Sequence, residues 1–429
     1  MQATQIRASV LGLLVGVGVL CSMVTANADT TSPDTSLAQG RQLRRAGKEN
    51  DALAELRRAR AAAAGKGDVA VKIEWEIART HIAKRDFASA MSTCKGMSSS
   101  APAVSHVCAA EAHLLWRRGT EALTEVAEVA KLKDVPLDAR YYAKVAEGRA
   151  QELATKDAEA DAAYKKAIEI ADDRADAHAL LGAMQHRLGK DGVPELRRAA
   201  SLDARDPVVQ YELGRALATD PGKTNDAIAA YERAIAERPT FTDALRGLTE
   251  AYLAAKRIPD AKKTAEATLK SAPNDVHAHI AMGRVALAEG RADDALKEGE
   301  AAFKLMPNEG KAKLLVADAY AKKGEVDLAL EAYQAAYGLD HGDASPLVNA
   351  ARACLDAGRP TSAKAFAKKA TQDFPAHAPS WVMLGDAFVA DKDVPSARAA
   401  YETAKKQRDA DVAGIDAKLA RLRDARPQS

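Results

Sequence analysis

Small apolar residues recur through the second half of the sequence at a fixed spacing of 34 residues. This column consists of Ala227, Ala261, Ala295, Ala329, Ala363 and Ala397. Prolines recur with the same period at Pro239, Pro273, Pro307 and Pro375, with His341 at the remaining place. Because proline cannot continue a helix and disfavours helical backbone just before it, each proline predicts the end of one helix. The pattern therefore predicts an array of repeated helical units.

Two further sets of positions indicate two helices in each unit. Small residues stand in the expected first helices at Gly283, Ala317, Ala351 and Gly385. They allow two helices to approach closely, and we expect the rings of Tyr320 and Phe388 to fill the space beside them. Glycines separate the two helices at Gly290, Gly324 and Gly358. A turn there can use the backbone freedom of glycine.

The period and the residue types resemble the tetratricopeptide repeat family. The last unit carries Trp381, Leu384, Gly385, Phe388, Ala397, Tyr401 and Ala404 at the W, L, G, Y, A, F and A places of the family. The resemblance implies an all-α fold, a right-handed α-solenoid of stacked antiparallel helix pairs. It also implies a concave groove, lined by the first helices, that binds peptides or helices of partner proteins.

The repeat pattern continues upstream in a weaker form and gives about eleven units in total. We divide the chain into a signal peptide (1–28), a flexible leader (29–35), degenerate repeats (36–205), a regular array (206–407), and a C-terminal capping helix with a tail (408–429). The last segment alternates charged and apolar residues, as a terminal helix that covers the end of a solenoid should.

The N-terminal segment has the three parts of a secretory signal. Arg7 precedes an apolar run over residues 10–20, and Ala26-Asn27-Ala28 offers a cleavage site after Ala28. We therefore expect an exported, periplasmic protein with no transmembrane span in the mature chain. Cys21 leaves open a lipid anchor, although Leu20 stands where lipoprotein signals carry a small residue.

Composition adds two constraints on the partners and the fold. Lys and Arg total 62 against 60 Asp and Glu, so no basic excess exists to neutralise phosphates, and we expect no nucleic acid partner. Apolar residues make up 47% of the chain but aromatic residues only 4%. This composition favours closely packed helices with small contact residues.

Three cysteines follow the predicted signal: Cys94, Cys108 and Cys354. Cys94 and Cys108 lie at the end of one predicted helix and inside the next, so an exported protein could form a disulfide between them. The alternative is that all three are small buried residues, as free cysteines often are. Cys354 has no evident partner.

A column of charged residues follows the small positions of the first helices. It consists of Arg215, Glu250, Arg284, Asp318, Arg352 and Asp386, with signs that alternate without exception. One interpretation is a structural ladder of ion pairs between stacked helices, each worth about 0–1 kcal/mol. The other is a groove of mixed charge that selects mixed-charge partners. A clamp for a chaperone tail is not expected, because only Lys311 and Asn349 come near its Lys and Asn set.

Catalytic motifs are absent from the sequence. It has no phosphate-binding glycine loop, HExxH, GxSxG or paired CxxC. His277 and His279 point in different directions on a helix, and His106 and His113 share a face that offers too few ligands for a metal.

We therefore predict a non-enzymatic interaction scaffold without cofactor or metal. The alternatives are a lipid-anchored assembly factor for a secretion or outer-membrane complex, and an accessory binding subunit of polysaccharide export. The sequence leaves the oligomeric state open.

Overall fold

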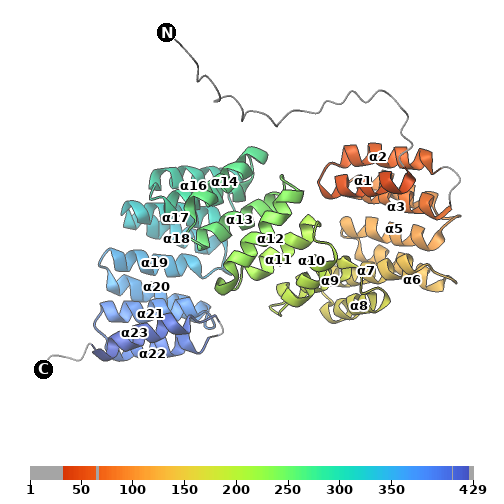
Figure 1. Ribbon diagram of the computed structural model, residues 1–429. Coiled ribbons are helices and arrows are strands. Elements are labelled where there is room, and N and C mark those ends of the chain that lie inside the picture. Colours follow the sequence, from red (N-terminus) through yellow and green to blue (C-terminus); the bar gives the residue numbers. More distant parts are fainter. Residues whose placement is uncertain (1–31, 64–66, 408, 425–429) are drawn as a thin grey trace, which may run out of the picture.

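The computed structural model describes residues 32–63, 67–407 and 409–424, and these residues form twenty-three α-helices and no strand (Figure 1). The predicted signal peptide, Cys21 and residues 29–31 lie outside the described residues. Consecutive helices pair into eleven units, the number that the repeat pattern predicts. The predicted all-α solenoid of stacked helix pairs is confirmed.

The first five units are α1 (Pro33–Arg45) with α2 (Glu49–Ala62), α3 (Gly67–Ala83) with α4 (Phe87–Gly96), α5 (Pro102–Leu115) with α6 (Gly119–Lys131), α7 (Leu137–Leu153) with α8 (Asp157–Ile170), and α9 (Ala175–Arg187) with α10 (Val193–Leu202). Helix α1 begins at Pro33, inside the segment 29–35 that the sequence analysis assigns to a leader. The side chain of Ser32 explains the early start, because its Oγ accepts a hydrogen bond from the amide of Thr35 at 3.2 Å and caps the helix.

The other six units are α11 (Pro207–Leu217) with α12 (Thr224–Glu237), α13 (Thr242–Ala254) with α14 (Ile258–Ser271), α15 (Val276–Ala288) with α16 (Ala292–Leu305), α17 (Gly310–Lys323) with α18 (Val326–Leu339), α19 (Ser345–Asp356) with α20 (Pro360–Asp373), and α21 (Ala378–Ala390) with α22 (Val394–Lys405). A short 3₁₀ turn, η1 (Pro221–Lys223), precedes α12, and α23 (Val412–Asp424) packs on α22.

The turns between and within units follow the proline and glycine positions. Helices α12, α14, α16 and α20 each end two residues before the repeated proline. Gly290, Gly324 and Gly358 have positive φ angles of 80°, 80° and 68°. Other units place Lys256 and Lys392 in this left-handed conformation, which costs a residue with a Cβ more than it costs glycine.

The core between the two helices of a unit combines buried alanines with, in three of the described units, a contact between a glycine and a tyrosine. All six alanines of the 34-residue column are fully buried. Beside Gly385, a Cβ would lie 2.3 Å from Cε1 of Tyr401, a residue of the second helix. Tyr320 and Phe388, which we expected to fill this space, are only partly buried at the edges of the core clusters. The ring in contact with the glycine thus comes from the second helix.

The N-terminal half curves until its first helix meets the sixth unit. Nη1 of Arg45 lies 2.6 Å from Oδ2 of Asp203, and Nε lies 3.8 Å from Oδ2 of Asp206. Nε of Arg238 donates to the carbonyl of Arg45 at 2.7 Å, across 193 residues of sequence. In Figure 1 the end of α1 accordingly lies near α10 and α12. We refer to Arg45, Asp203, Asp206 and Arg238 as the closing contact.

Candidate binding groove

A groove of about 700 Å³ crosses the first helices α11, α13, α15 and α17. Small residues form part of its floor, among them Gly247, Ala251 and Ala281. The ring of Tyr231 comes from α12 and lies beneath, so close that a Cβ on Gly247 would be 2.6 Å from its Cζ. Because the side chains on the floor are small and the ring below them is buried, the groove has room for the peptide backbone of another molecule.

Charged side chains of both signs line this groove. Arg284 of α15 forms an ion pair with Glu250 of α13, which belongs to the preceding unit. Arg246 pairs with Asp243 on its own helix. Burial raises the pKa of Glu250, and the neighbouring Arg284 opposes that shift. Lys311 also lines the groove, and it is exposed with no ion-pair partner in the part of the chain that the structure describes.

The predicted ladder of alternating charges is not continuous. Within the column, only Glu250 and Arg284 form an ion pair between adjacent units. Arg215 instead pairs with Glu212 on its own helix at 2.7 Å. Arg352 is exposed and has no ion pair among the described residues. Arg215 and Arg352 therefore form no ion pair with an acid of this column.

Buried tyrosines explain why the acids of the column leave the ladder. Tyr333 donates its hydroxyl to Oδ1 of Asp318 at 2.6 Å, and Tyr401 donates to Oδ1 of Asp386 at 2.6 Å. Asn349 donates to the same oxygen of Asp318 at 3.0 Å. Burial raises the pKa of Asp318, and these two hydrogen bonds oppose the shift. Asp318 and Asp386 thus accept hydrogen bonds from hydroxyl groups of the second helices. Three of the six column residues line the groove: Arg215, Glu250 and Arg284.

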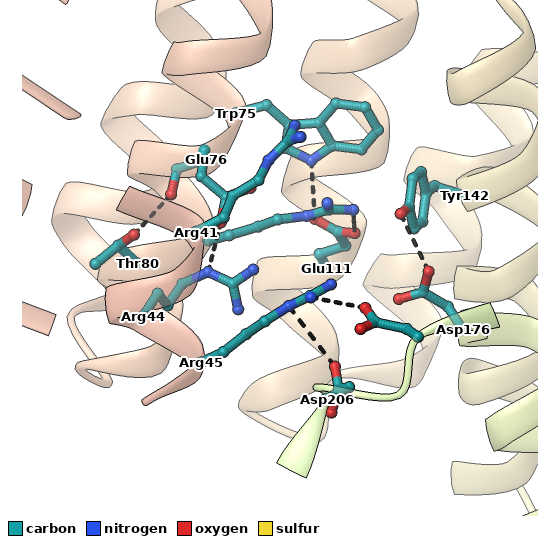
Figure 2. Close-up of polar contacts among 12 residues, drawn as sticks. Arg41, Arg44, Arg45, Trp75, Glu76, Thr80, Glu111, Tyr142, Asp176 and Asp206 are labelled. Atoms are coloured by element: carbon teal, nitrogen blue, oxygen red, sulfur yellow. Dashed lines mark hydrogen bonds and ion pairs between the residues drawn. The ribbon is translucent and has the colours of Figure 1, made fainter. Parts of the chain in front are cut away.

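A polar ladder does exist, but in the degenerate N-terminal half (Figure 2). Glu76 of α3 is 2% exposed and accepts from two arginines of α1. Arg79 of α3 donates twice to Glu111 of α5, at 3.0 and 2.6 Å. Tyr142 of α7 donates to Asp176 of α9 at 3.2 Å. The sequence pattern did not predict this ladder, although its partners are separated by 32 to 35 residues, close to the repeat period.

An aromatic pair reinforces this ladder. The guanidinium of Arg79 lies over the ring of Trp75 at 4.4 Å and over that of Tyr142 at 4.3 Å. Nε1 of Trp75 donates to Glu111 at 2.9 Å. Since Arg79 is held by rings on two units and by a carboxylate on a third, it joins units two, three and four.

The structure joins Cys94 and Cys108 through a disulfide, with their Cα atoms 5.5 Å apart, while Cys354 is a buried free thiol. Two of the four candidate metal residues have carboxylate partners, whereas Nδ1 of His113 is buried without a hydrogen-bond partner in the described chain. His106 bonds Glu125 at 2.7 Å and His279 bonds Glu298 at 2.7 Å. No group of three or more His, Cys, Asp or Glu side chains in the described residues is arranged to hold a metal ion.

None of the described helices combines the length and the apolar character needed to cross a membrane. No curated protein matches the sequence.

Three solved structures resemble the fold. The yeast Tom70 structure is 12% identical with a TM-score of 0.48, covering 91% of this chain and 96% of that one. A tetratricopeptide repeat protein from Parabacteroides merdae is 14% identical with a TM-score of 0.46, covering 66% and 99%. The APC/C hetero-tetramer Cut9-Hcn1 structure is 14% identical with a TM-score of 0.44, covering 92% and 84%.

Family models for the tetratricopeptide repeat match residues 218–285, 280–344 and 354–422. The matched segments cover the regular units in which the 34-residue period, the buried alanine column and the terminal prolines coincide. The chain therefore belongs to the tetratricopeptide repeat family.

Proposed function

We propose that this protein is a non-enzymatic scaffold of the cell envelope that holds a partner protein by an extended segment in the groove across α11, α13, α15 and α17. One observation carries the proposal: a groove of about 700 Å³ with a floor of small residues and walls of both charges. Small residues let a peptide backbone approach closely. The charged walls can then select partners whose side chains alternate in sign.

The envelope location rests on the N-terminal sequence. Arg7, the apolar run over 10–20 and Ala26-Asn27-Ala28 support export and cleavage after Ala28. N-terminal sequencing of the protein used for partner capture tests this, and the expected first residue is Asp29. A mature chain that begins at Cys21 with added lipid mass would instead establish the lipid-anchored alternative.

Partner capture from envelope extracts tests the groove through charge reversal at Lys311. This side chain is exposed and unpaired in the described chain, so Lys311→Glu should leave folding unchanged while reversing one wall charge. We expect recovery of the partner to fall by about tenfold, which corresponds to roughly 1.4 kcal/mol. Arg352→Glu is the matched control, because Arg352 is also an exposed cation of a first helix but lies outside the groove lining.

Asp318 is unsuitable for this test. Its replacement would leave the buried hydroxyl of Tyr333 without an acceptor and would disturb the fold. If the wild type, Lys311→Glu and Arg352→Glu recover the same partner equally at physiological salt, the groove is not the binding site.

A further inference from the structure

A second hollow lies within the N-terminal half, apart from the groove. It is a cavity of about 370 Å³ between α1, α3, α7, α9 and the residue that precedes α11. Its lining is mostly charged, with Trp75 and Tyr142 as the aromatic members. The closing contact brings α1 over this space, and Figure 2 shows Arg45 reaching across it to Asp206.

The acidic groups of this cavity already have donors inside the protein. Glu76 accepts from two arginines of α1, and Asp138 pairs with the arginine that precedes α9. Asp176 accepts from the tyrosine hydroxyl of α7 at 3.2 Å. Asp206 caps α11 by accepting from its first amides at 2.8 and 3.2 Å. None of these carboxylates depends on a ligand for a partner.

Several donors, in contrast, remain unused. Arg41 and Arg44 reach Glu76 through Nε alone, at 3.1 and 2.5 Å. The terminal nitrogens of both guanidinium groups have no acceptor within the described chain, and neither has Nζ of Lys72, which lines the same cavity. Because Glu76 is 2% exposed, it holds both arginines at a fixed place. A guanidinium with a free edge binds a carboxylate through two parallel hydrogen bonds.

An apolar notch of about 490 Å³ adjoins the cavity and shares Lys72, Trp75 and Asp138 with it. The notch exists because α5 is one turn shorter than its neighbours. Helices α3 and α7 have 17 residues each and α5 has 14, while all three end in the same positive-φ turn. The start of α5 is therefore recessed between them.

The walls of the notch are mainly apolar and come from several elements, with charged side chains such as Asp68, Lys133 and Asp134 among them. The apolar side chains include Val71 of α3, Val104 of α5, Val135 of the loop before α7, and Leu137. Leu137 is 46% exposed and lines the notch. The Cys94–Cys108 disulfide ties α5 to α4 and so fixes the recessed helix start.

We propose that the cavity and the notch form one binding site for a carboxylate attached to an apolar group. The carboxylate lies against the free guanidinium edges of Arg41 and Arg44 with Lys72 beside it, and the apolar group lies in the notch. The same chemistry is offered by a free aryl or acyl acid and by the last residue of a protein chain. This site is distinct from the groove and does not depend on the function proposed for it.

Calorimetric titration of the full chain with N-acetyl-phenylalanine tests the proposal. We expect saturable binding, and binding roughly 10- to 100-fold weaker for the matching amide, which lacks the charged group. A pentapeptide that ends in phenylalanine distinguishes the two sources. If the peptide binds and its amidated form does not, the ligand is a chain end; if only N-acetyl-phenylalanine binds, it is a small acid.

Two variants separate binding from folding. Lys72→Gln removes an exposed cation without a partner, and Leu137→Glu places a carboxylate in the notch. We expect each to weaken binding about tenfold or more with unchanged thermal unfolding, since neither breaks a contact of the fold. Lys166→Gln, at an exposed site on α8, is the control and should bind as the wild type does. Absence of binding by every probe, equal binding of acid and amide, or unchanged binding by both variants would overturn the proposal.

Discussion

At the scale of single residues, a tyrosine of the second helix lies on a glycine of the first in three of the described units. The ring of Tyr401 touches Gly385, and its hydroxyl donates to Asp386, the residue directly after that glycine. Tyr164 lies on Gly148 in the same way. One side chain therefore fixes both the distance between two helices and the position of an acid on the concave face.

Replacement of Gly385 by alanine should destabilise the last unit. The new Cβ would lie 2.3 Å from Cε1 and 2.5 Å from Cδ1 of Tyr401, whose hydroxyl bond prevents the ring from moving away. We expect a loss of about 1–3 kcal/mol, measured by urea denaturation.

Gly338→Ala is the control for this change. Gly338 lies in α18 with nothing within 4 Å of a Cβ, so alanine there should stabilise by roughly 0.5–1 kcal/mol. The same chemical change would thus act with opposite signs. Equal effects at the two positions would show that helix propensity alone, and not contact with the ring, decides the outcome.

At the scale of helices, the least regular units are held by bonds that the regular ones do not use. Cys94 at the end of α4 is joined to Cys108 in α5, and Oγ of Ser105 donates to the carbonyl of Cys94 at 2.8 Å. The capping helix has its own bond, since Lys418 of α23 lies 2.6 Å from Asp386. These contacts hold neighbouring helices together where the residues typical of the repeat are missing.

We predict that the Cys94–Cys108 bridge is present in the isolated protein and stabilises the α4–α5 pair. Closing a loop with a separation of 14 residues is worth about 3 kcal/mol. Peptide mapping without reductant should recover the two cysteines together and Cys354 as a free thiol. Hydrogen exchange after reduction should rise first in α4 and α5. Recovery of both cysteines as free thiols would contradict the prediction.

At the scale of the whole molecule, the two halves of the solenoid differ in what occupies their concave faces. The N-terminal half meets itself through the closing contact, and its own arginines, acids and rings line its inner face and leave only a smaller cavity there. In the C-terminal half, small residues of the first helices form the floor of the groove, and the groove stays open. This difference is the reason for placing the proposed binding of an extended partner in the second half.

Charge reversal at the closing contact should open the N-terminal half. Arg45→Glu would face Asp203 and Asp206 with a third carboxylate, so we expect a loss of roughly 1–2 kcal/mol in a partly exposed setting. Hydrogen exchange should rise in α1 and around α10 to α12, with α15 to α22 unchanged. Arg205→Glu breaks a neighbouring exposed pair with Glu237 and serves as the control. Exchange that rises equally along the chain would indicate one cooperative core instead.

The sequence by itself determined the repeat, the pairing of helices and most of their ends. These features are local, because a proline, a glycine turn or a buried alanine acts on its own helix pair. Tertiary structure alone decided three others: the transfer of Asp318 and Asp386 from the ladder to tyrosines, the closing contact, and the cavity behind Arg41 and Arg44. Each depends on small rotations that add up from unit to unit. Such rotations decide whether residues 193 positions apart meet, and no single repeat encodes their sum.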